Sequence, residues 1–261
     1  MRRVISVLVC AAALAACTTS PSASPTSASL TASSTSPTPS ASPTPTPSST
    51  PSTVSPSPTP TGADARIVPV GTAQWARIKA AGMARPGCPV TRTDLRRVEV
   101  NHWGFDGQVH RGVLVVRSDV AESVARIFTE LYDAKFPIRR MKPLEEYGGD
   151  NEKSMADDNT AAYNCRSATQ QNAPPTQSPH ANGRAIDVNP YENPWQDPRC
   201  KPCWSPSDTY GANRSGKGVI VKGGVVWTAF TREGWIWQDI DVKDYMHFDT
   251  GYPSRPFSPS G

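Results

Sequence analysis

The chain has 261 residues, of which 27 are Lys or Arg and 23 are Asp or Glu, so its formal net charge is +4. Arg2 and Arg3 are the only charged residues before Asp64, and leaving them out reduces the net charge of the remainder to +2. A charge this small gives no electrostatic argument for a nucleic-acid partner, and we expect none.

Residues 1–17 have the pattern of an export signal. Two arginines precede the apolar run 4–16, which is too short to span a bilayer as a stable helix. The residues Leu14 to Cys17 resemble a bacterial lipobox, in which the cysteine is lipidated and becomes the mature N-terminus. We therefore predict a lipid anchor at Cys17 and a position on the outer face of the bacterial cell membrane. The alternative is an ordinary secretory signal that is cleaved elsewhere in this small-residue stretch.

Residues 18–63 are predicted to be a disordered linker. Positions 18–62 are almost entirely Ser, Thr, Pro and Ala and carry no charge. Such a composition cannot bury a core and favours extended polyproline segments, so that roughly 45 residues would reach about 140 Å when fully extended. The remaining residues, 64–261, suffice for a single domain with a hydrophobic core.

Apolar periodicity predicts the elements of this domain. Trp75 and Ile78 lie on one face of a predicted helix over 70–81. The segments 95–100 and 109–116 are predicted strands separated by the turn-forming residues 104–107, and the unbroken apolar run Val113 to Val116 predicts burial on both faces. Further helices are predicted over 120–136 and 225–231, further strands over 138–141 and 234–237, and a solvated acidic loop over 148–162.

The cysteines of the domain are four in number, which in an exported protein predicts disulfides. Three pairings are possible, and we favour Cys200–Cys203 as a local loop with Cys88–Cys165 closing a long one. The competing interpretation is a zinc or redox site at the Cys-x-x-Cys pair, which lacks a second such pair.

Two short segments combine histidine with acids. His180 and Asp187 are seven residues apart, with the small residue Gly183 between them, and their side chains are ligands that suit zinc. Asp244 and His247 follow sixty residues later and offer a third ligand and a second acid. Three protein ligands and one open position are typical of a catalytic zinc. His102 and His110 have no acid at ligand spacing, and we expect structural or surface roles for them.

These segments resemble a known family. Ser178, His180, Gly183, Ala185 and Asp187 match the S-x-H-x-x-G-x-A-x-D pattern of the zinc D-alanyl-D-alanine carboxypeptidases, a family that includes L-alanyl-D-glutamate peptidases. Gly234-Trp235 and the run Asp244 to Phe248 look like its closing signature, so the resemblance covers most of residues 85–250.

The resemblance implies roles for individual residues. His180, Asp187 and His247 would hold one zinc ion, and Asp244 would be the general base, a step that spacing alone cannot supply. Asp249 is a rival acid for that role, but relatives often have Glu after His-Phe, so the resemblance implies that it hydrogen-bonds a metal ligand instead. Two further residues have implied roles in substrate binding or catalysis: Arg166 would be a charged donor for the scissile carbonyl or a substrate carboxylate, and Ser178 would hydrogen-bond a ligand or the substrate.

The chain departs from the family in one place. The family often has W-G-G-D-W near the last strand, whereas here Trp237 is followed by Gln238-Asp239. This difference affects the expected shape of the cleft wall and therefore the substrate preference.

We therefore expect an α+β domain, mainly an antiparallel sheet backed by helices, with a single zinc site. The expected activity is zinc-dependent hydrolysis of a peptide bond in peptidoglycan stem peptides, of the D-Ala-D-Ala carboxypeptidase type, by a monomer. The alternatives are an endopeptidase of the L-Ala-D-Glu type and a non-catalytic lipoprotein that binds the cell wall.

Overall fold

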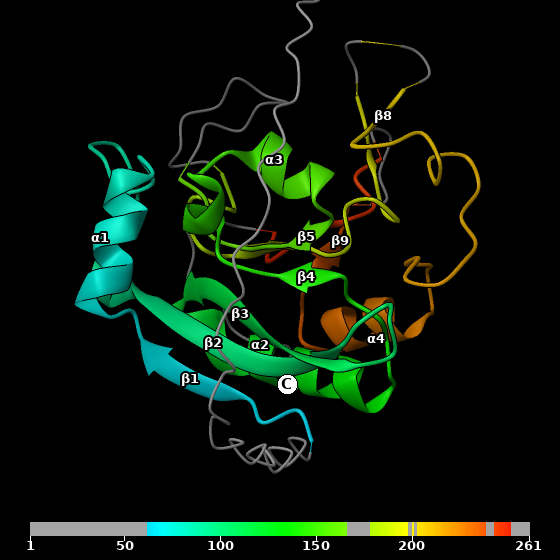
Figure 1. The fold of residues 1–261 in the computed structure, drawn as a ribbon, viewed down its shortest axis with the longest axis horizontal. Helices are drawn as coiled ribbons and strands as arrows, with labels where there is room; N and C mark the ends of the chain where they lie inside the picture. Colours follow the sequence, from blue (N-terminus) through cyan, green and yellow to red (C-terminus); the bar gives the residue numbers. More distant parts are fainter. Residues whose placement is uncertain (1–61, 166–177, 198–199, 201–202, 239–242, 252–261) are drawn as a thin grey trace, which may run out of the picture. The chain divides into compact units, whose positions relative to one another are not determined.

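The computed structural model describes residues 62–165, 178–197, 200, 203–238 and 243–251 (Figure 1). The predicted export signal with Cys17, nearly all of the predicted linker and Arg166 lie outside these residues. None of the described helices is long and apolar enough to span a bilayer.

The first sheet consists of three antiparallel strands in the order β1-β2-β3, with bounds β1 Arg66–Pro69, β2 Leu95–Trp103 and β3 Val109–Arg117. Alternate side chains of a strand face opposite sides, and in this sheet Val98 lies opposite Leu114 on the side that packs against helix α2 (Ala121–Asp133). Val115 points the other way and is buried in a second cluster, which confirms burial on both faces for Leu114 to Val116, whereas Val113 is half-buried.

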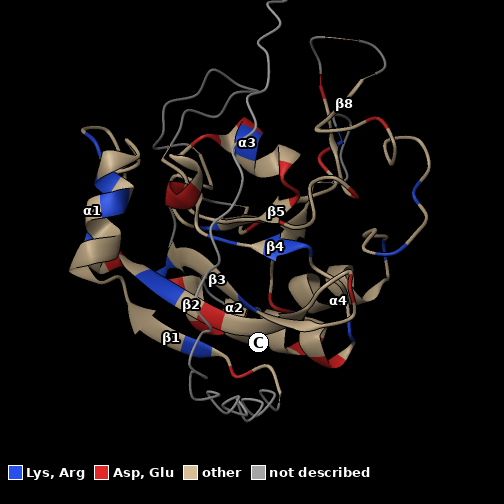
Figure 2. Cartoon of the chain, viewed as in Figure 1, with Lys and Arg blue, Asp and Glu red and all other residues tan. Residues whose placement is uncertain are grey.

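Charged side chains form ion pairs along the first sheet. Glu99 of β2 pairs with Arg97 two residues earlier on the same strand at 2.6 Å, and with Arg111 of the neighbouring strand β3 at 3.4 Å. Lys and Arg recur along α1 (Thr72–Ala80) and β2 (Figure 2). The predicted helix over 70–81 is confirmed by α1, in which Ile78 is buried.

The second sheet carries the candidate ligands. Its antiparallel strands lie in the order β6-β10-β9, with bounds β6 Ala185–Asp187, β10 His247–Asp249 and β9 Ile236–Trp237. Ile186 and Phe248 face the same core as the first sheet, together with helix α4 (Val225–Arg232). Phe248 stacks on Phe230 of α4 with ring centroids 4.1 Å apart. Replacing a buried phenylalanine by alanine typically costs about 3–5 kcal/mol of stability, so this core holds the second sheet firmly.

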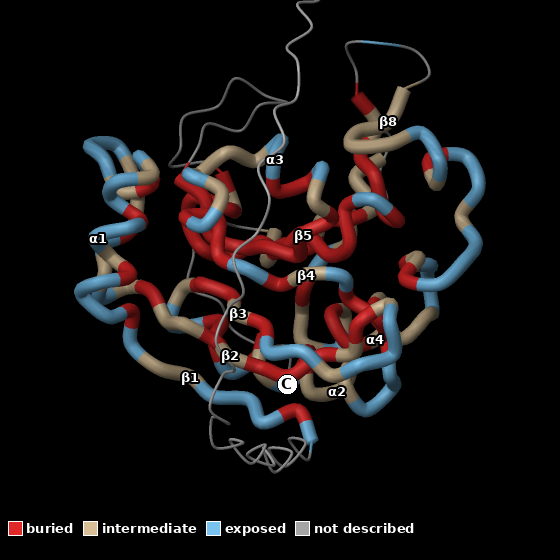
Figure 3. The backbone as a smooth tube through the Cα atoms, viewed as in Figure 1, coloured by how far each residue is buried: buried red, intermediate tan, exposed pale blue. Residues whose placement is uncertain are grey.

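The stretch 148–162 is not the solvated loop expected from its acidic residues. It forms the short helix α3 (Asn151–Ala156) and strand β5 (Asn159–Thr160), and β5 pairs in parallel with β4 (Arg140–Met141). The Asp150 side chain accepts a hydrogen bond from the Lys153 amide and is the N-cap of α3. An acidic residue that suggested a loop therefore stabilises the start of a helix. Figure 3 shows buried backbone around β5 at the centre of the domain.

The remaining short elements complete the domain. The strands β7 and β8 form a hairpin, and single turns of 3-10 helix connect the larger elements; their bounds are β7 Trp195–Gln196, β8 Trp204–Ser205, η1 Arg92–Asp94, η2 Ser118–Val120 and η3 Leu144–Tyr147. The fold is α+β as expected, with β4–β5 as a parallel pair among antiparallel ones. Strand β4 is shorter than the strand predicted over 138–141.

Both disulfides favoured from the sequence are present, Cys88–Cys165 and Cys200–Cys203. The first closes a loop with a sequence separation of 77 residues. In the chain-entropy view, closing a loop of that length stabilises a fold by roughly 4 kcal/mol. It ties the segment after α1 to the residue that immediately precedes Arg166.

Candidate metal centre

The three candidate ligands are brought together by two neighbouring strands. Asp187 is the last residue of β6 and His247 is the first of β10, and the antiparallel register places them directly opposite each other. Their side chains leave the sheet on the side away from Ile186 and Phe248, because alternate residues of a strand face opposite ways. Strand pairing therefore positions two of the ligands.

His180 reaches the same point from a tight turn before β6. The Gly183 amide donates to the His180 carbonyl at 3.0 Å, and Gly183 has a positive φ of 67°. A Cβ at this position would lie 2.7 Å from the backbone nitrogen of Arg117, so only glycine allows the turn to approach β3. The Arg117 amide in turn donates to the Gly183 carbonyl at 2.8 Å, which fixes the turn against the first sheet.

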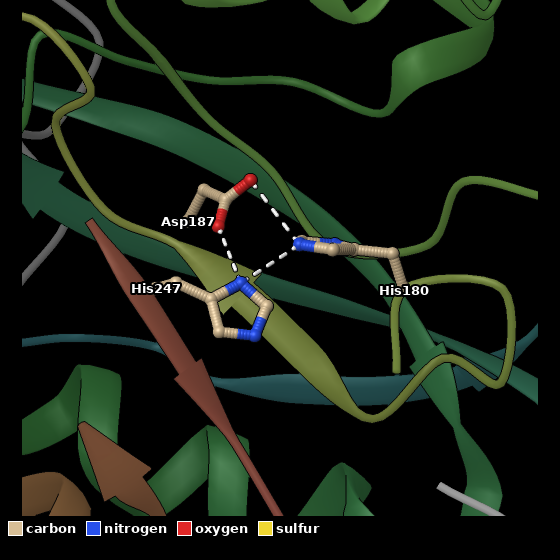
Figure 4. A group of neighbouring side chains, drawn as sticks. All are labelled: His180, Asp187 and His247. Atoms are coloured by element: carbon tan, nitrogen blue, oxygen red, sulfur yellow. Dashed lines mark hydrogen bonds and ion pairs between the residues drawn. The ribbon is translucent and has the colours of Figure 1, made fainter. Parts of the chain in front are cut away.

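The three side chains point toward one another (Figure 4). His180 Nε2 lies 3.2 Å from Asp187 Oδ2, and His247 Nδ1 lies 3.0 Å from Asp187 Oδ1. The two imidazole nitrogens are 3.1 Å apart. His180 and Asp187 are only 5% and 6% exposed, so water cannot easily compensate for this crowding of polar atoms.

The outer nitrogen of each histidine identifies which tautomer is present. His180 Nδ1 lies 2.7 Å from the Ala162 carbonyl, and His247 Nε2 lies 3.1 Å from Asp249 Oδ2. Both partners are acceptors, so both outer nitrogens carry a hydrogen, and each inner nitrogen would supply an electron pair once a metal displaces any proton held between it and Asp187.

The centre therefore presents two imidazole electron pairs and a carboxylate to the same point. A cation satisfies all three at once, and this nitrogen and oxygen set suits a borderline divalent metal. The residues present fit a single metal ion.

The electrostatics of the pair also favour positive charge at this point. Burial would raise the pKa of Asp187, but His180 and His247 outweigh it and hold that pKa well below its usual range. Burial would lower the pKa of His247, but Asp187 and Asp249 outweigh it and raise that pKa well above its usual range. Asp187 is therefore held as a carboxylate, and the positive charge beside it is carried by a proton on His247 in the metal-free protein.

Comparison with known families bears on the same segment. Residues 171–250 match the family model described as D-alanyl-D-alanine carboxypeptidase. This segment, with the metal-site residues it contains, is similar to that family. No curated protein and no solved structure matches the chain. The match includes all three ligands and both segments on which the resemblance was based.

In this carboxypeptidase-like site, Asp249 lies beside the candidate ligand His247 and contacts its outer nitrogen, as the resemblance implied. It is buried, and its Oδ1 accepts from the Gly251 amide at 2.5 Å. Its Oδ2 accepts from His247 and also from the side-chain amide of Gln238, at 2.8 Å. The sequence did not identify Gln238 as a hydrogen-bond partner of Asp249. It also missed the Ala162 carbonyl, since a backbone acceptor leaves no trace in residue type.

Asp244 lies on the turn that leads into β10. The His247 amide donates to the Asp244 carbonyl at 3.2 Å, which closes the turn from 244 to 247, and Asp244 also forms a β-bridge with Trp195. The spacing of three thus belongs to a turn and not to a regular strand, on which the two side chains would diverge. Among the described residues, the mutually close group of ligand atoms holds His180, Asp187 and His247 without Asp244.

Ser178 is buried at the start of the His180 turn. Its Oγ accepts from the Ala181 amide at 3.3 Å, so its described contact is with the turn itself. Arg166 lies outside the described residues, and its role stays a prediction.

The two other histidines lie outside the metal centre. His102 is buried on β2, and burial lowers its pKa to about 4, whereas His110 is exposed and contacts Asp106 at 3.0 Å. These placements are the structural and surface roles expected for them.

A second group of potential ligand atoms is formed by Asp197, Cys200 and Cys203. The two sulfur atoms are joined in a disulfide, so neither is a thiolate that could bind a metal.

Substituting His180 by alanine should remove one of the three converging donors. We expect the affinity for zinc to fall by more than the 10- to 100-fold loss typical of an outer-shell partner, because a direct ligand is lost. Competition with a chromophoric chelator measures this. His110→Ala is the matched control and should bind zinc like the wild type; equal affinities for all three proteins would remove His180 from the centre.

Proposed function

We propose that the protein is a zinc-dependent peptidase that hydrolyses a peptide bond in peptidoglycan stem peptides, with D-Ala-D-Ala carboxypeptidase action as the specific activity. The observation that carries the proposal is the convergence of His180, Asp187 and His247 at one buried point, within a segment that matches D-alanyl-D-alanine carboxypeptidases. His180 Nε2, His247 Nδ1 and Asp187 would hold one zinc ion. Bound zinc supplies Lewis-acid polarisation of a carbonyl and lowers the pKa of a coordinated water.

Asp244 is the proposed general base. Its carboxylate would take the proton from the attacking water and deliver it to the nitrogen of the leaving amine. The support is its place on the turn closed by His247, which ties the base and a ligand to one short rigid segment.

Arg166 is the proposed cationic group for the substrate. A guanidinium is always charged and would donate to the scissile carbonyl oxygen or to a substrate carboxylate. The support is its position directly after Cys165, whose disulfide to Cys88 anchors that end of the segment. Ser178 would act from the His180 turn by a hydrogen bond to a ligand or to the substrate.

The proposed site of action is the cell-wall space. A lipid on Cys17 would anchor the protein to the outer face of the cell membrane, and the Ser/Thr/Pro-rich linker would let a monomeric domain reach the stem peptides of the wall. The composition of residues 1–63 supports this arrangement.

The direct test is mass spectrometry of purified muropeptides after incubation with the protein, with and without a zinc chelator. We expect D-alanine to be released from pentapeptide stems, and the release to stop on chelation and return when zinc is added. Internal stem fragments would instead establish an endopeptidase of the L-Ala-D-Glu type. Intact muropeptides from zinc-loaded protein would contradict the proposal and favour a wall-binding role.

Asp244→Asn separates the base from the ligands. The amide cannot accept the proton of the attacking water, so turnover should fall by about 10²–10⁴-fold, the usual contribution of a general base. Zinc affinity should stay at the wild-type value because the three donors are intact. Asp133→Asn, an exposed change at the end of α2, is the control and should keep full turnover. Near-normal turnover in Asp244→Asn would refute the assignment.

A further inference from the structure

Gln238 is joined to the segment 244–249, which carries the candidate ligand His247, by three separate hydrogen bonds. It follows β9 directly, next to β10, the strand that begins at His247. We propose that Gln238 is a positioning residue for the metal ligand His247, acting through the Asp249 carboxylate. This inference deepens the proposed function and rests on its metal centre.

The backbone of Gln238 holds both ends of the turn that carries the base and a ligand. Its amide donates to the His247 carbonyl at 3.1 Å, and its carbonyl accepts from the Asp244 amide at 3.0 Å. These bonds place the side chain of Gln238 beside the strand and do not depend on which side chain it is.

The side chain of Gln238 supplies the third bond. Its Nε2 donates to Asp249 Oδ2 at 2.8 Å, and the same oxygen accepts from His247 Nε2 at 3.1 Å. Oδ1 is held by the Gly251 amide at 2.5 Å. The Asp249 carboxylate therefore accepts three hydrogen bonds: one from the candidate ligand His247, and two from Gln238 and Gly251.

The strand explains why Asp249 can act on His247. Residues i and i+2 of a strand face the same side, so in β10 the Asp249 side chain lies beside the outer face of the His247 ring. A carboxylate with only one oxygen fixed can rotate about its last bond. The Gln238 amide fixes the second oxygen and keeps it aimed at His247 Nε2, and this fixes the tautomer and the direction of the Nδ1 electron pair.

The chemistry requires an amide donor that reaches across from β9. Asp249 is 5% exposed, and its carboxylate can only accept hydrogen bonds. An apolar side chain at 238 would therefore leave a buried acceptor with one hydrogen bond fewer. Loss of an outer partner of a metal-bound histidine typically costs 10- to 100-fold in metal affinity or activity.

Gln238→Met tests the side chain alone, because methionine has similar length and volume but no N–H, and the backbone bonds remain. We expect the dissociation constant for zinc, measured by chelator competition on the full chain, to rise about 10-fold, which corresponds to about 1.4 kcal/mol. Gln108→Met, at an exposed position, is the matched control and should bind zinc like the wild type. A Gln238→Met constant within twofold of the wild-type value would overturn the proposal.

A double-mutant cycle distinguishes positioning from a general loss of structure. In an Asp249→Ala background, Gln238→Met should change zinc affinity by less than twofold, because the carboxylate through which it acts is gone. Each metal-free variant should still unfold in one cooperative thermal transition, which shows that the fold itself is kept. A full 10-fold effect that persists without Asp249 would contradict the proposed route.

Gln238→Asn provides a second variant in case Gln238→Met does not fold. Its amide is one methylene too short to keep the 2.8 Å bond, so zinc binding should weaken in the same direction. Unchanged affinity in a folded Gln238→Asn protein would also overturn the proposal. These readouts use zinc alone without peptide, so failure of the wild type to cleave stem peptides would refute the proposed function and leave this inference standing.

Discussion

The pairing of β6 with β10 determines where the candidate metal centre lies and which atoms it offers. Their register puts Asp187 opposite His247, and the same two strands turn Ile186 and Phe248 into the core on the other side. Candidate ligands and core residues thus alternate along these two strands. A shift of the strand register by one residue would turn the core residues toward the metal site and the candidate ligands into the core. The stacking of Phe248 on Phe230 makes such a shift unfavourable, since it would expose a large buried side chain.

Groups outside the ligands then decide what the centre can bind. The Ala162 carbonyl and the Asp249 carboxylate occupy the outer nitrogens of His180 and His247 and leave both inner nitrogens as acceptors. Ala162 lies next to Ala161, which bridges to Asp187, so one short segment after β5 supports two ligands. The support comes from parts of the chain far apart in sequence, and this is why the centre depends on the whole fold and not on the motifs alone.

The sequence predicts the centre better than its surroundings. His180, Asp187 and His247 are recognisable as candidates because metal ligands must be particular residue types. Strand β3 is recognisable from its unbroken run of apolar residues between polar segments. The helix α3 and strand β5 are missed, since acidic composition predicts loop and their stability comes from tertiary contacts. Gln238 is missed as a partner of Asp249 because the residue type alone does not show which carboxylate a glutamine side chain will contact.

The central claim is that His180 Nε2, His247 Nδ1 and Asp187 bind one zinc ion. The most direct measurement is anomalous diffraction above and below the zinc absorption edge from crystals of the zinc-loaded protein. We expect one strong peak, about 2.0–2.2 Å from those two nitrogens and from an Asp187 oxygen. A peak bonded to His247 Nε2, or one at Asp197 with Cys200 and Cys203 and none at the three ligands, would contradict it.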